Sequence, residues 1–136
     1  MGGQSASSHF RLQKALALPL KESIGVLKDF LASESDKECL DYARFSLALR
    51  LQQNRNTDEA LEVFRAIASD LTSPWSLYAQ EEIGTIFYLM GESHVAEAEL
   101  LKALNMCSGQ DSVERITDFL EDVRGRKVSV RNSGGA

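Results

Sequence analysis

The chain has 136 residues, of which 43% are hydrophobic and 26% are charged, and its formal net charge is -5 at pH 7. These values are typical of a soluble globular protein, and they exclude a fibrous chain or one that is disordered throughout. No apolar run approaches the roughly 18–20 residues that cross a bilayer, and an acidic chain lacks the basic field that holds nucleic acid.

The chain is predicted to be nearly all α-helical. Apolar residues recur three, four and seven positions apart through most of it, as on one face of a helix, and no alternating β-branched segment predicts a strand. Pro19 and Pro74 stand where helices can begin, because the first turn of a helix needs no proline N–H. In chain order the predicted helices cover residues 9–18, 19–32, 37–53, 57 to the turn at 72–74, 74–90, 93–106 and 111–124.

The two ends of the chain are expected to be flexible. Residues 1–8 are polar and lack the basic and apolar blocks of a secretory signal, so we interpret them as a leader. The tail at 125–136 is basic, and such a tail is usually solvated. A cluster of positive charges near the C-terminus consists of Arg124 and, within the tail, Arg126, Lys127 and Arg131.

The segment 77–110 carries a repeat pattern of 34 residues in a helix–turn–helix arrangement. The pattern is formed by Gly84, Phe87, Gly91, Ala96, Ala103 and Leu104. It resembles the tetratricopeptide repeat (TPR) family, which implies that Gly84 and Ala96 are small because the two helices pass closely there. The same resemblance implies that Phe87 fills the wedge against the next pair, and Gly91 permits the tight turn.

Two weaker copies extend the resemblance over most of the chain. In residues 37–76, Ala60 aligns with Ala96 and Phe64 aligns with Leu100. A degenerate copy at 9–36 places Ser23 and Leu27 at the same two positions, and 111–124 is predicted to be an apolar-striped helix that caps the array. We therefore expect one helical domain over 9–124; the alternative is a generic helical bundle.

The resemblance to the TPR family implies a right-handed superhelix of stacked antiparallel helix pairs. In such an array the first helix of each pair lines a concave groove that binds a protein or peptide, and tyrosine suits such a surface. The groove-facing residues that the resemblance implies are Tyr42, Phe45, Leu49 and Gln52 in the helix predicted at 37–53, and Tyr78, Glu81, Thr85, Tyr88 and Leu89 in the helix predicted at 74–90.

Phe45 and Leu49 fit a second interpretation equally well, in which they pack against the N-terminal helices or the last helix. If they do face the groove, they occupy places where TPR proteins that grip acidic chaperone tails carry a lysine and an asparagine. An apolar peptide or an amphipathic helix is then the better expectation for the partner.

The sequence offers no recognisable catalytic, cofactor-binding or metal-binding motif. His9 and His94 are the two histidines, and neither belongs to an H-E-x-x-H pattern. Cys39 and Cys107 are isolated, so we expect small buried or half-buried side chains rather than a disulfide or a zinc site. We accordingly expect no enzyme activity and no cofactor.

The leading functional hypothesis is a non-catalytic, cytoplasmic adaptor or chaperone-like module that holds a protein partner. The alternative is a structural subunit of a larger complex or homo-oligomer, which predicts a large exposed apolar patch. A third hypothesis, nucleic-acid binding through the basic tail, is opposed by the acidic body. We expect no insertion into a membrane.

Overall fold

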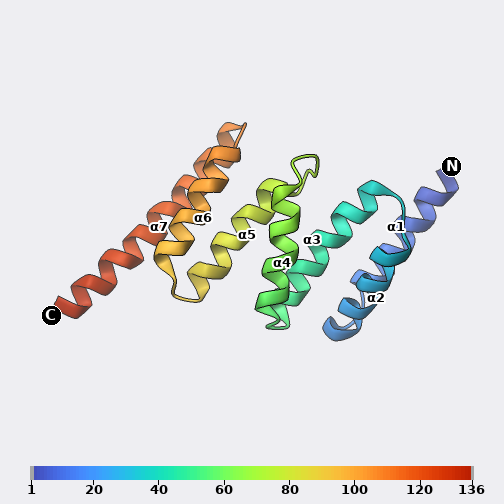
Figure 1. Cartoon of the computed structure of the whole chain (residues 1–136), viewed down its shortest axis with the longest axis horizontal. Coiled ribbons are helices and arrows are strands. Elements are labelled where there is room, and N and C mark those ends of the chain that lie inside the picture. Colours follow the sequence, from blue (N-terminus) through green and yellow to red (C-terminus); the bar gives the residue numbers. More distant parts are fainter. Residues whose placement is uncertain (1, 136) are drawn as a thin grey trace. The chain divides into compact units, whose positions relative to one another are not determined.

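A computed structural model describes the backbone of residues 2–135 and the side chains of residues 7–125. Over residues 2–135 it contains seven helices and no strand, which confirms the predicted all-α fold class. The helices are α1 (Gly2–Leu16), α2 (Leu20–Ser33), α3 (Lys37–Gln53), α4 (Thr57–Ser69), α5 (Ser76–Leu89), α6 (Ser93–Met106) and α7 (Gln110–Gly135) (Figure 1). None of them, within the described residues, combines the length and the apolar character needed to cross a membrane.

The chain divides into two compact units, residues 1–76 and residues 77–136, and each is described by itself. The sequence instead predicted one domain over 9–124. The division falls where the best repeat copy begins, at residue 77, so it coincides with a predicted boundary between repeats.

Both terminal helices are longer than predicted. Helix α1 begins at Gly2 rather than at residue 9, and α7 continues to Gly135 rather than ending near residue 124. Glycine and serine lower helix propensity by up to about 1 kcal/mol each, but only proline, which both ends lack, breaks a helix outright. The predicted flexible leader and tail are thus helical over the described backbone. The side chains of Arg126, Lys127 and Arg131 lie outside the described residues.

Helix α5 also begins later than predicted, at Ser76 instead of Pro74. The Ser73 hydroxyl accepts a hydrogen bond from the Trp75 N–H at 3.1 Å, and the Ser76 N–H donates to the Ser73 carbonyl at 3.2 Å. Ser73 therefore caps a turn over residues 73–76, and the helix starts only after that turn. The turn places Trp75 against α3, as described below.

In the first unit, α1 and α2 pack against α3, and α3 packs against α4. The buried Ser23 hydroxyl donates to the Ala15 carbonyl at 2.8 Å, which joins α2 to α1. Arg50 of α3 donates to the Leu16 carbonyl at 3.1 Å and so satisfies the end of α1. Asp36 precedes α3 and caps it, since its side chain accepts a hydrogen bond from the Cys39 N–H at 3.2 Å. The buried apolar residues are Leu12, Ala15, Ile24, Leu27, Phe30, Cys39, Ala43, Phe45, Leu47, Ala48, Leu51, Ala60, Phe64 and Ile67.

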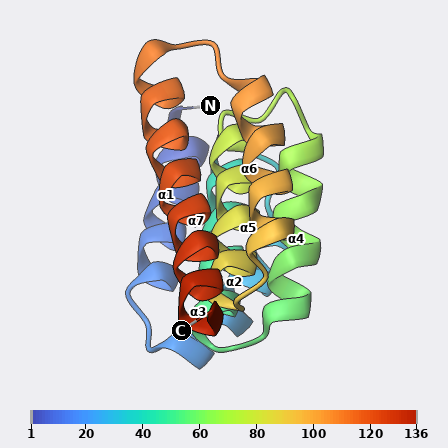
Figure 2. The same ribbon diagram turned by 90° about the vertical axis from the view of Figure 1, so that its left-hand side faces the viewer.

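In the second unit, α5 and α6 approach each other closely at Gly84. A Cβ atom at Gly84 would lie 2.7 Å from Cδ2 of Leu100, a side chain that is fully buried. The structure therefore explains why this position is glycine. Helix α7 runs antiparallel to α6 (Figure 2) and buries Ile116, Leu120 and Val123 against it. Each large apolar side chain buried in this way contributes about 1.5–3 kcal/mol to folding.

The turns of the two central helix pairs share one backbone geometry. After α3, Arg55 has φ 64°, and the Asn56 N–H donates to the Leu51 carbonyl at 2.8 Å. After α5, Gly91 has φ 81°, and the Glu92 N–H donates to the Phe87 carbonyl at 2.9 Å. In each turn an N–H bonds to the carbonyl five residues earlier, next to a residue in the left-handed region, as in a Schellman motif. The predicted role of Gly91 is confirmed.

Candidate functional site

The four predicted groove residues of α3 differ in their surroundings. Tyr42 is 37% exposed, whereas Phe45 is only 9% exposed and belongs to the core. The Phe45 ring stacks on Trp75, with centroids 4.9 Å apart, and meets Phe64 edge-on at 5.8 Å. Trp75 and Phe64 thus cover most of the Phe45 ring, and its assignment to the groove stays a prediction. Leu49 and Gln52 are half-buried.

The predicted groove residues of α5 are engaged largely by α7. Arg115 Nε donates to Glu81 Oε1 at 3.1 Å, and its guanidinium lies 5.5 Å from the centre of the Tyr78 ring. One turn further along α7, Phe119 meets Tyr88 edge-on, with centroids 5.5 Å apart. These three side chains of α5 therefore contact α7 within their own unit, and Tyr78 remains 45% exposed.

The two remaining α5 residues of the predicted groove lie apart from these contacts. The Thr85 hydroxyl donates to the Glu81 carbonyl at 3.2 Å within the helix. Leu89, at the end of α5, is 68% exposed. Of the predicted groove residues, Tyr42, Tyr78 and Leu89 keep substantial exposed surface, and they belong to two separately described units.

A pocket of about 330 Å³ lies within the first unit beside Trp75, and we call it the Trp75 pocket. The Tyr42 and Trp75 rings lie in its wall at 5.3 Å between centroids and 56° between planes. Sequence reasoning did not find this pocket, because Trp75 lies in the turn over residues 73–76 and no local pattern indicates that this turn meets α1 and α3. Its lining residues are His9, Leu12, Gln13, Glu38, Cys39, Tyr42, Pro74 and Trp75.

Cys39 and His9 meet in the wall of the Trp75 pocket. Sγ of Cys39 lies 3.7 Å from Nδ1 of His9, a pairing that resembles a cysteine nucleophile beside its base. Burial raises the pKa of the Cys39 thiol, and the charges of Asp36, Glu34 and Glu38 raise it further. A thiol with a raised pKa keeps its proton at neutral pH, so this pair lacks the activated thiolate that nucleophilic catalysis needs.

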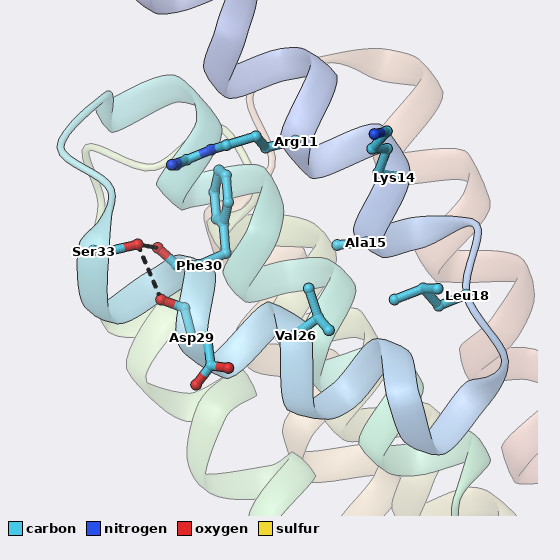
Figure 3. Close-up of a pocket in the computed structure, with 8 residues that line it drawn as sticks. All are labelled: Arg11, Lys14, Ala15, Leu18, Val26, Asp29, Phe30 and Ser33. Carbon is cyan, nitrogen blue, oxygen red and sulfur yellow. Dashed lines mark hydrogen bonds between the residues drawn. The ribbon is translucent and has the colours of Figure 1, made fainter.

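An open groove of about 460 Å³ runs between α1 and α2, and we call it the α1–α2 groove. Figure 3 shows Phe30 and Val26 of α2 turned toward α1, with Ala15 and Leu18 opposite them. These four residues form the apolar floor of the groove. Within this floor, the Val26 side chain is 41% exposed. The groove is completed by Arg11, Lys14, Asp29 and Ser33.

The two sides of the α1–α2 groove carry opposite charges. Arg11 and Lys14 stand on the α1 side, and Asp29 stands on the α2 side with its carboxylate directed away from α1 (Figure 3). The Arg11 guanidinium lies 5.1 Å from the centre of the Phe30 ring, and its Nη2 atom pairs with Glu34. Arg11 is thereby held at the edge of the apolar floor.

Glu34 fixes the corner at which α1, α2 and α3 meet. Its Oε1 atom accepts hydrogen bonds from the backbone N–H groups of Ser35 and Asp36, each at 3.0 Å. The hydrogen bond from Asp36 is the largest cause that lowers the pKa of Glu34 to about 2, followed by that from the Ser8 hydroxyl, with a further contribution from the charge of Arg11. This carboxylate stays ionised through the physiological range and keeps Arg11 in place beside the groove.

The described part of the chain contains no group of three or more histidine, cysteine or acidic residues that could hold a metal ion. Cys39 is a buried free thiol and Cys107 a half-buried one. His94 is exposed in the first turn of α6. Arg124, the one residue of the basic cluster with a described side chain, donates through Nε to Glu97 Oε1 at 3.2 Å.

Comparisons of the chain with protein-family models, with curated proteins and with solved structures found no match.

Proposed function

We propose that this protein is a non-catalytic protein-binding module, adaptor or chaperone-like, that holds an amphipathic helix of a partner in the α1–α2 groove. The observation that carries the proposal is the groove itself: an open apolar channel between two helices, bordered by charges of opposite sign. Helix-in-groove binding uses such a channel for the apolar face of the partner. A reducing, cytoplasmic location is part of the same proposal, and the two free thiols are consistent with it.

We further propose that the helix pairs are TPR-like repeats that stack in a right-handed superhelix, with α7 as the cap. Burial at equivalent positions supports the repeat. The small residues Ser23, Ala60 and Ala96 are all fully buried. The large residues four positions later, Leu27, Phe64 and Leu100, are fully buried as well. The shared geometry of the α3–α4 and α5–α6 turns supports the same equivalence.

The charges beside the groove indicate which helix fits. A partner helix that lays apolar residues on Val26 brings one of its edges near Arg11 and Lys14 and the other near Asp29. Charge complementarity favours acidic side chains on the first edge and a basic side chain on the second. The expected partner therefore has apolar residues at i, i+3 or i+4, and i+7, with acidic residues along one edge.

Selection from a library of peptides about 20 residues long, displayed on phage, tests this proposal with the full chain as target. We expect the selected peptides to carry that pattern and to bind at least about tenfold more weakly to a Val26→Asp variant, since a charge on the floor opposes apolar burial. Val95→Asp is the matched control, because Val95 is also a helical valine, 37% exposed, but stands on α6. Circular dichroism checks that both variants remain helical.

Two outcomes would refute the proposal. One is a selection that yields no binding peptide. The other is a set of peptides whose affinity is unchanged by Val26→Asp, or reduced equally by Val95→Asp.

A structural subunit is the second candidate function, and exposed apolar residues near the α5–α6 turn favour it. Leu89 and Met90 are 68% and 55% exposed. In a permanent assembly such residues would be covered by a neighbouring subunit. If the neighbour is a second copy of this chain, light scattering will show association that grows with concentration, and Leu89→Asp/Met90→Asp will abolish it.

A further inference from the structure

We infer that the Trp75 pocket binds a basic side chain, lysine or arginine, presented by a polypeptide. This site is separate from the α1–α2 groove, because the two are lined by opposite faces of α1. His9, Leu12 and Gln13 line the pocket, whereas Arg11, Lys14, Ala15 and Leu18 line the groove. At 100° per residue these two sets point in opposite directions. The inference therefore stands or falls independently of the proposed function.

The aromatic wall of the pocket suits a cation. The rings of Tyr42 and Trp75 contact each other, with centroids 5.3 Å apart and planes tilted by 56°, so a cation in the pocket meets the part of their surface that lines it rather than a gap between them. Cations are attracted to the faces of tryptophan and tyrosine, with tryptophan the strongest. Trp75 is held in position because its ring stacks on Phe45 and its backbone N–H donates a hydrogen bond to the Ser73 hydroxyl. This wall is thus preorganised before a ligand arrives.

The charges around the pocket favour the same ligand. The Glu38 carboxylate lines it, and the charges of Asp36, Glu34 and Glu38 all act on the Cys39 thiol in its wall. The neighbouring basic residues are paired with carboxylates: Nζ of Lys37 lies 2.9 Å from Asp41, and Nη1 of Arg44 lies 3.7 Å from it. An incoming cation therefore meets a negative local field, which the overall charge of -5 reinforces.

The size of the pocket limits what it can hold. A volume of about 330 Å³ is near the lower end of the range for ligand sites, roughly 300–1,000 Å³. It can take one long side chain with its solvent, but not a helix. The hydroxyl of Tyr42 and the amide of Gln13 can accept hydrogen bonds from an ammonium or guanidinium group.

Trp75 provides the measurement, because it is the single tryptophan of the chain and its fluorescence reports directly on the pocket. The full chain is titrated with acetylated pentapeptide amides that carry arginine, lysine or citrulline at the centre. Citrulline has nearly the shape of arginine without its charge. We expect the arginine and lysine peptides to change the Trp75 emission in a saturable way, and the citrulline peptide to bind at least about fivefold more weakly.

Two variants and one small cation sharpen the test. Tyr42→Ala and Glu38→Gln should each weaken binding of the arginine peptide by about threefold or more. Glu62→Gln makes the same change of charge at an exposed site on α4, and Val26→Asp alters only the groove, so both should bind the peptide like the wild type. Methylguanidinium, the same cation without a peptide, should bind at least about tenfold more weakly than the peptide.

The inference is overturned if the citrulline peptide binds as tightly as the arginine peptide, or if no peptide changes the emission. It is likewise overturned if Glu38→Gln and Tyr42→Ala bind like the wild type. Equal binding of methylguanidinium and the peptide would assign the pocket to free organic cations and overturn the polypeptide ligand.

Discussion

The helix pairs α1–α2 and α5–α6 are each formed by two consecutive helices, but they differ in their packing. At Gly84 of α5 the helices are so close that Leu100 leaves no room for a Cβ atom. Gly25 of α2 is exposed and nothing lies within 4 Å of such an atom, and elsewhere the α1–α2 pair leaves a groove of about 460 Å³ on one side. The α1–α2 pair thus leaves open space on its surface, whereas the α5–α6 pair is closely packed at Gly84.

The pairs also differ in what covers them. In the second unit, α7 lays Ile116, Leu120 and Val123 on α6 and reaches Glu81 and Tyr88 of α5 through Arg115 and Phe119. In the first unit the α1–α2 groove remains open. In the second unit, α7 thus covers α5 and α6, whereas in the first unit the α1–α2 groove is open.

The largest effect is expected from loss of close packing in the second unit. Leu100→Ala removes a fully buried side chain and should lower the free energy of unfolding by about 2–5 kcal/mol. Val26→Ala, on the open side of the α1–α2 groove, should change it by no more than about 0.5 kcal/mol, as for most surface substitutions. Urea unfolding followed by circular dichroism measures both. Equal losses in the two variants would contradict the contrast between the pairs.

The same methyl group should have opposite effects at the two glycines. At Gly25, alanine removes the helix penalty of glycine and should stabilise the protein by about 0.5–1 kcal/mol. At Gly84 the same gain is opposed by an overpacking cost of about 1–3 kcal/mol, because Leu100 cannot move away freely. We therefore expect Gly84→Ala to be neutral or destabilising, by up to about 2 kcal/mol. Thermal unfolding of both variants checks the sign, and a stabilised Gly84→Ala protein would show that α5 and α6 are not tightly packed.

The smallest effects concern two carboxylates whose pKa values shift in opposite directions. The folded pKa of Glu34 is about 2, below its ordinary value of 4.5, so its stabilisation is complete above pH 4.5 and is lost as the pH falls toward 2. Burial, and then the charge of Glu81, raise the pKa of Glu82, so Glu82 lowers stability once the pH rises above 4.5. At pH 7, Glu34→Gln should destabilise the protein slightly and Glu82→Gln should stabilise it slightly.

Stability measured against pH distinguishes these two effects. The difference between wild type and Glu34→Gln should shrink between pH 4.5 and about 2, and that for Glu82→Gln should vanish below pH 4.5. Differences that do not depend on pH would mean that the substitutions act through packing rather than charge.

The features that could be predicted from the sequence are those set by local signals. Asp36 caps α3 by accepting a hydrogen bond from the N–H of Cys39, only three residues later in the chain. Such an interaction depends on neighbouring residues alone, so a sequence can indicate it. Ser23 and Leu27 are buried as the degenerate repeat predicted, because helical spacing fixes which residues share a face. These signals explain why the starts of α3, α4 and α6 were located correctly.

The features that could not be predicted depend on contacts between distant segments. Phe45 lies in the core because Trp75, which lies in the turn over residues 73–76, stacks on its ring. Tyr88 is occupied because Phe119 of α7 meets it. No periodic pattern in either helix states which other segment will cover a given face, so the predicted groove mixed core residues with exposed ones. The α1–α2 groove and the Trp75 pocket were missed for the same reason.

The covalent attachment of α7 has a consequence for competition. A helix joined by a short loop to the surface it covers has an effective concentration in the millimolar range. A free peptide that seeks the same face of α5 and α6 must exceed that concentration or bind far more tightly than α7 does. A free helix would therefore compete poorly for the face that α7 covers, whereas the proposed binding of a helix in the α1–α2 groove would face no such competition.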